Sequence, residues 1–191
     1  MLEECVNAQI AEEKYDLDAN LNLLKLYQLN PTMYKADVVA KILIKCVMAL
    51  PKSDLVLAKC LIDQSRTDDR LVKLILEFGN LLEVCQFRSV WKLLRDNPDT
   101  FGEIRGFEDS IRDFICHVIN ITYQNIDYNL LKELLGKIDD EQVTTYINKN
   151  NWEVKSDSVV FITNHMATIR SRNIEEKIDP SGILETLRAA A

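Results

Sequence analysis

The pair Cys116-His117 is the first place in this sequence where the residue types could support catalysis. A thiolate nucleophile needs an imidazole within hydrogen-bond reach of its sulfur. Neighbouring residues on a helix point about 100° apart around its axis, so these two side chains would not face each other. We therefore expect Cys116 to border the hydrophobic core and His117 to be a partly exposed or capped polar residue.

Three consecutive acids, Asp139, Asp140 and Glu141, could suggest acid–base chemistry or metal binding. Either role needs a concave site and a second partner group. Acids are also favoured in the first turn of a helix, and this is the role we predict for them. The sequence has no glycine-rich phosphate loop, no H-E-x-x-H and no G-x-S-x-G motif. We expect no catalytic residue, no cofactor and no metal site.

The composition is that of a helical globular protein with an acidic surface. Of 191 residues, 47% are hydrophobic and 28% charged, with only 5 Gly and 4 Pro. The net charge is −7, of which residues 1–105 contribute −2 and residues 106–191 contribute −5. A protein that binds nucleic acid through its phosphates usually has a basic surface, so neither half is expected to bind nucleic acid in this general way.

Cysteine usage and the N-terminal residues indicate a cytosolic or nucleocytoplasmic protein. The five cysteines are odd in number and include no C-x-x-C pair, which favours reduced and mostly buried thiols. The N-terminal residues are acidic where a signal peptide would be basic. The longest run without a charged residue, Phe114–Ile126, has 13 residues, fewer than the roughly 20 of a membrane-spanning helix.

Residues 1–105 are predicted to form successive helices. One stripe recurs at steps of three and four and ends before Pro51; it comprises Val39, Ile42, Leu43, Cys46, Val47 and Leu50. The next helix, which carries Leu55, Ala58 and Ile62, is apolar nearly all round, so we expect it to be central. Short connections favour antiparallel helical hairpins stacked into a HEAT-like domain.

The pattern changes after residue 105. Residues 106–170 show three helical segments, followed by β-branched and aromatic runs at Trp152–Val154 and Val159–Ile162 around a polar turn. Three helices and a β-hairpin in this order predict a winged-helix domain. Residues 171–191 form a C-terminal segment with a short helix around Ser181–Arg188, whose apolar residues are Ile183, Leu184 and Leu187.

A helical stack that leads into a winged helix resembles the PCI family, which supplies scaffold subunits to the proteasome lid, the COP9 signalosome and translation initiation factor 3. The similarity to the initiation-factor members is carried, in order along the chain, by Tyr15–Pro31, Lys59–Gln64, Gly106–Gln124, Asn125–Asp127 and Asn173–Asp179. The resemblance implies a non-catalytic subunit of the initiation-factor complex, which binds the small ribosomal subunit, and a close pairing with its subunit L. Family members usually have more helix before the first of these segments, so the first helical hairpin here is expected to be shortened.

Two surfaces are predicted to contact partner subunits. Val159, Val160, Phe161 and Ile162 form an apolar strand, which we expect at the exposed edge of the sheet, where it could pair with a partner's strand. The resemblance implies that the apolar stripe of the last helix also bundles with other subunits. The alternative is that Val160 or Phe161 faces the local core and the last helix packs on its own domain.

Two other functions remain open from the sequence. The chain could be the equivalent small PCI subunit of the signalosome or the proteasome lid. It could also be a winged-helix nucleic-acid binder, although the three acids would lie where a recognition helix meets phosphates. Direct DNA binding is therefore not expected, nor is contact with a membrane.

Overall fold

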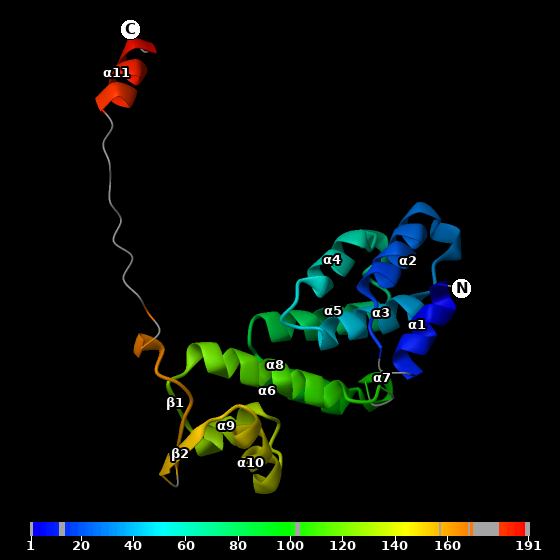
Figure 1. The fold of residues 1–191 in the computed structure, drawn as a ribbon. Helices are drawn as coiled ribbons and strands as arrows, with labels where there is room; N and C mark the ends of the chain where they lie inside the picture. Colours follow the sequence, from blue (N-terminus) through cyan, green and yellow to red (C-terminus); the bar gives the residue numbers. More distant parts are fainter. Residues whose placement is uncertain are drawn as a thin grey trace.

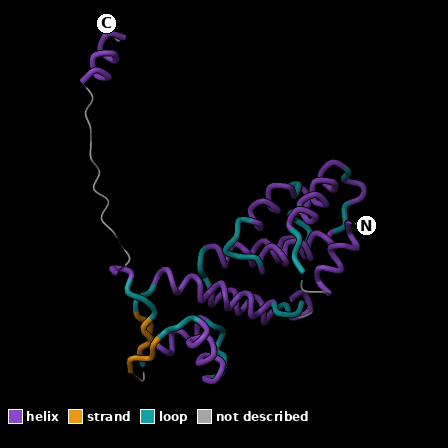
Figure 2. The backbone as a smooth tube through the Cα atoms, in the orientation of Figure 1, coloured by secondary structure: helices purple, strands orange, loops and turns teal. Residues whose placement is uncertain are grey.

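The computed structural model describes residues 2–11, 14–101, 104–156, 158–167, 169 and 180–189. This part of the chain is mainly helical, with one small antiparallel sheet (Figures 1 and 2). The Asn173–Asp179 segment lies outside the described residues. The helices are α1 (Leu2–Ala11), α2 (Leu17–Leu29), α3 (Ala36–Met48), α4 (Asp54–Leu61), α5 (Arg70–Glu83), α6 (Phe87–Asp96), α7 (Pro98–Phe101), α8 (Phe107–Thr122), α9 (Tyr128–Leu134), α10 (Asp140–Lys149) and α11 (Pro180–Ala189). The strands are β1 (Asn125–Asp127), β2 (Glu153–Ser156) and β3 (Val159–Phe161), and short 3-10 turns lie at Pro31–Met33, Gln64–Arg66 and His165–Ala167.

Helix α3 is the central helix of the first half. It packs against α1, α4 and α5, and nine of its thirteen residues are buried. The predicted stripe from Val39 to Val47 is confirmed as core, whereas Leu50, beyond the helix end, is only partly buried. This helix, whose side chains are apolar on most sides, occupies the position that the sequence suggested for α4.

The prediction that α4 is central is wrong. Leu55 and Ala58 are fully buried, but Val56 and Leu57 are about half exposed. Helix α4 lies in the outer layer beside α2 (Figure 1). Only one side of an eight-residue outer helix can face the core, so its remaining apolar residues meet solvent.

Polar contacts join α1 to the rest of the helical half. The Gln9 and Asn20 side-chain amides exchange hydrogen bonds of 3.0 and 3.1 Å, and both residues are buried. Glu3 accepts hydrogen bonds from Tyr27 and Lys35 at 2.7 and 2.6 Å. Helix α1 thus places ten residues before the Tyr15–Pro31 segment, and it packs against α2 within that segment.

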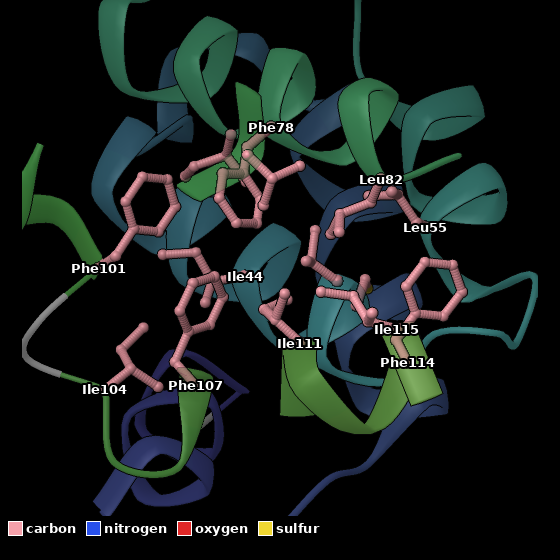
Figure 3. Close-up of a cluster of buried hydrophobic side chains, with 14 of the residues drawn as sticks. Ile44, Leu55, Phe78, Leu82, Phe101, Ile104, Phe107, Ile111, Phe114 and Ile115 are labelled. Carbon is pink, nitrogen blue, oxygen red and sulfur yellow. The ribbon is translucent and has the colours of Figure 1, made fainter. Parts of the chain in front are cut away.

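The two halves of the chain share one hydrophobic core. Phe78 of α5, Phe101 of α7 and Phe107 of α8 form a cluster of rings with centroids 4.8 to 5.5 Å apart. Figure 3 shows Ile111 and Ile115 of α8 continuing this layer, and both are fully buried. The expected boundary near residue 105 thus falls where the core is continuous.

A second contact between the halves is built around Trp91 of α6. Its indole N–H donates to the Leu134 carbonyl at 2.7 Å, and the Arg112 guanidinium lies 5.2 Å from the ring centroid. Gly136, just after α9, has a φ of +96°, and a Cβ added there would lie 2.9 Å from the Trp91 ring. This glycine is needed both for its backbone conformation and for the close approach of the indole.

Replacing Gly136 should therefore destabilise the protein more than replacing Gly106, a matched control. Gly106 also has a positive φ, of +73°, but nothing lies within 4 Å of its added Cβ. We expect Gly106→Ala to lower the free energy of unfolding by about 1 kcal/mol through backbone strain alone. Gly136→Ala should lower it by roughly 3 kcal/mol, because overlap with Trp91 is added. Urea unfolding measures both values, and equal losses would contradict this account of Gly136.

The shared core predicts that both halves unfold together. The chain has two tryptophans, Trp91 in the first half and Trp152 in the second, so Trp152→Phe and Trp91→Phe each leave one local reporter. Within each variant, the fluorescence and far-UV circular dichroism midpoints in urea should coincide. Phe107→Ala should lower stability by about 3–5 kcal/mol and shift both reporters equally. Separate midpoints for the two reporters would mean that the halves unfold independently.

Candidate partner-docking surfaces

The expected edge strand is the central strand of the sheet. The strand order is β1-β3-β2, and β3 pairs antiparallel with both neighbours. Its backbone groups are therefore engaged on both sides, and the prediction of an exposed edge at Val159–Ile162 is wrong. The sequence revealed the hairpin of β2 and β3, but it did not reveal that β1 covers the other side of β3.

The four apolar residues of this segment divide between the two faces of the sheet. Val160 is fully buried and Ile162 is 6% exposed, so both face the core of their own domain. Val159 and Phe161 are half-buried on the opposite face, where the Lys155 ammonium lies 3.9 Å from the Phe161 ring centroid. Their part in an interface stays a prediction, now restricted to contacts of Val159 and Phe161 side chains.

On the hairpin side, the outer edge of the sheet is formed by β2, which pairs with β3. Its register pairs Glu153 with Phe161 and Val154 with Val160, and a bulge follows before Ser156. Val154 is 58% exposed although it lies on the same face as the buried Val160. Sequence reasoning missed this edge, since position in a sheet depends on a third strand that is distant in sequence.

Strand β1 was missed because it is only three residues long. Ile126 is its one buried residue and pairs with Val160, between the exposed Asn125 and Asp127. The Asp127 carboxylate then accepts hydrogen bonds from the Asn129 and Leu130 backbone N–H groups in the first turn of α9. An apolar residue flanked by polar ones directly before a helix cap is the only local signal of this strand.

Helix α11 is confirmed and presents the predicted stripe to solvent. Ile183 and Leu184 are adjacent, Leu187 follows about one helical turn later, and the three are 48, 55 and 63% exposed. Figure 1 shows α11 away from the rest of the described chain. Because a ten-residue helix is only marginally stable in water by itself, an apolar partner surface would stabilise it.

Two charged residues of α10, the helix that would read nucleic acid in a winged helix, are paired within the fold. Lys132 lies 2.8 Å from the Asp140 carboxylate, and this bond together with one from the Tyr128 hydroxyl holds the pKa of Asp140 below its usual value. Lys149, the cation of α10, pairs with Asp113 at 2.6 Å. Asp139 and Glu141 remain exposed, so this face would repel a phosphate backbone.

The thiols have environments that disfavour reactivity at the suspected dyad. Cys116 is buried, and burial raises the pKa of its thiol to about 12, whereas His117 is exposed. Burial also raises the pKa of Cys46, to about 11. The five cysteines are free, but the expectation that most are buried is wrong, because Cys60 and Cys85 are exposed and Cys5 is half-buried.

Within the described residues, no group of three or more His, Cys, Asp or Glu side chains is placed to hold a metal ion. No helix in that part of the chain is long and apolar enough to cross a membrane.

This chain is similar to a known protein family. A family model described as the CSN8/PSMD8/EIF3K family matches residues 33–173. Proteins named eukaryotic translation initiation factor 3 subunit K are similar over nearly the whole chain. The zebrafish (Danio rerio) protein is 48% identical over 93% of this chain and 81% of its own length, and the human protein is 46% identical over 93% and 82%. That of Caenorhabditis briggsae is 42% identical over 97% and 85%. The chain therefore belongs to the CSN8/PSMD8/EIF3K family.

Proposed function

We propose that this chain is a non-catalytic subunit of translation initiation factor 3. The observation that carries the proposal is its similarity, over at least 93% of its length, to proteins named as subunit K of that factor. The subunit acts in the cytoplasm by burying surface against neighbouring subunits, with subunit L as its closest partner. Through the complex it contributes to assembly on the small ribosomal subunit.

The division into a HEAT-like domain (1–105), a winged helix (106–170) and a C-terminal segment (171–191) is part of this proposal. The element order α8, β1, α9, α10, β2, β3 with strand order β1-β3-β2 supports the winged helix, since three helices alternate with a three-stranded antiparallel sheet. Sequential helices that pack as neighbours, α1 with α2 and α5 with α6, support a stack of helical hairpins. The two domains share one hydrophobic core.

Two surfaces supply the docking mechanism. The outer edge of β2 can accept backbone hydrogen bonds from a partner strand, and the exposed Val154 would add apolar contact. The apolar stripe of α11 can enter a groove between partner helices, because Ile183, Leu184 and Leu187 share one side of the helix. Both surfaces combine apolar centres with polar surroundings, which is typical of protein interfaces.

Affinity purification tests the assignment. We expect the tagged full-length chain, expressed in eukaryotic cells and analysed by mass spectrometry, to recover initiation-factor subunits, with subunit L among the most abundant. The family model also covers subunits of two other assemblies by its description, CSN8 and PSMD8. Recovery of signalosome or proteasome-lid subunits in place of initiation-factor subunits would overturn the proposal.

Acidic substitutions in the α11 stripe should weaken this recovery. Leu184→Asp combined with Leu187→Asp places two charges where burial of apolar side chains is expected, at about 2 kcal/mol or more of lost binding. The matched control, Glu185→Gln with Arg188→Gln, changes two exposed polar residues of the same helix and should leave recovery unchanged. Quantitative mass spectrometry of co-purified subunits gives the ratio. Equal recovery by both variants would exclude α11 as a docking element.

A further inference from the structure

Helix α6 presents a row of cations on one side. Arg88, Lys92 and Arg95 are exposed and follow one another at steps of four and three residues, so they share one helix face. No Asp or Glu occurs from Val84 to Arg95. Lys137 lies beside this helix, since it follows Gly136, which approaches the Trp91 ring. We call these four residues the basic stripe.

Three of the four cations are unpaired within the described chain. Arg88 pairs with Glu133 at 2.8 Å, but the side chains of Lys92, Arg95 and Lys137 have no hydrogen-bond or ion-pair partner among the described residues. The situation differs on α10, where Lys149 is paired with Asp113. These three side chains therefore contribute unpaired positive charge on a protein of net charge −7. Unpaired cations on α6 and beside it attract a polyanion, and binding releases counterions.

The chemistry of the stripe favours RNA over an acidic protein. Protein interfaces are built around a buried apolar or aromatic centre, and α6 has no large exposed apolar residue. Trp91 is 5% exposed, and Leu93 and Leu94 pack toward the core. Interfaces with nucleic acid, by contrast, are polar and strongly positive. The same burial of Trp91 leaves no ring on which a base could stack, so the contact would be to the backbone.

We propose that the basic stripe of α6 and Lys137 binds the sugar–phosphate backbone of double-stranded RNA without reading its sequence. This contact goes beyond the proposed subunit role, and it combines α6 of the helical half with Lys137 of the second half. Binding by the isolated chain is weak because only three unpaired cations take part. Within an assembly on an RNA-containing particle, such a contact would be intramolecular and so would act at high effective concentration.

A salt titration of the full-length chain tests the proposal. The probe is a fluorescein-labelled 20-base-pair RNA duplex of arbitrary sequence, followed by anisotropy from 25 to 200 mM KCl. Three phosphate contacts predict a slope of log K against log [KCl] of about −3. Lys92→Gln with Arg95→Gln should reduce the slope to about −1 and lower the affinity at 25 mM KCl roughly tenfold or more. A second duplex of unrelated sequence should bind equally.

The control changes charge by the same amount at other exposed positions. Lys25→Gln with Lys73→Gln, on α2 and α5, should leave slope and affinity unchanged, and circular dichroism verifies that both variants fold. No binding at 25 mM KCl, or equal losses in both variants, would overturn the proposal. So would tighter binding of a poly-glutamate peptide than of RNA, which would indicate an acidic protein partner. Affinity purification of the Lys92→Gln/Arg95→Gln variant should still recover initiation-factor subunits, which separates failure here from failure of the subunit assignment.

Discussion

The packing of α8 against both halves of the chain is the constraint on which the rest of the structure depends. Phe107, Ile111 and Ile115 bury one side of this helix against α3 and α5. Other residues of α8 hold the second half, including Asn120, which accepts a hydrogen bond from the Trp152 indole at 2.6 Å. Because α8 packs against both halves of the shared core, it joins the sheet and α10 to the helical stack. Docking at the sheet therefore orients the whole body, as a scaffold subunit requires.

The sequence predicted the helices well where local signals were strong. The stripe of α3 and its end before Pro51 follow directly from helical periodicity and from the geometry of proline. Layer position was not predictable in the same way, because periodicity reports how many sides of a helix are apolar and not which helix lies inside. Helix α4 has apolar residues on several sides yet lies outside, and Val56 and Leu57 are exposed as a result.

The candidate docking surfaces were predicted only in part, for a related reason. The stripe of Ile183, Leu184 and Leu187 depends on one helix alone, so the sequence was sufficient to find it. The free edge of the sheet depends on the pairing of β3 with β1, which joins residues more than thirty positions apart. The cations of the basic stripe on α6 were visible in the sequence as Arg88, Lys92 and Arg95, but which of them are paired, as Arg88 is with Glu133, depends on the fold.

The bulge between Val154 and Ser156 limits what the edge of β2 can recognise. Regular backbone pairing is available only at the beginning of this four-residue strand, and beyond the bulge the ladder of hydrogen bonds is disrupted. A short and irregular edge is a poor template for indefinite strand addition, so the isolated protein is protected from fibrous self-association. The same shortness means that an added strand would gain few backbone hydrogen bonds. Recognition at this edge must then come mainly from the side chains around it, which favours one matched partner over any extended peptide.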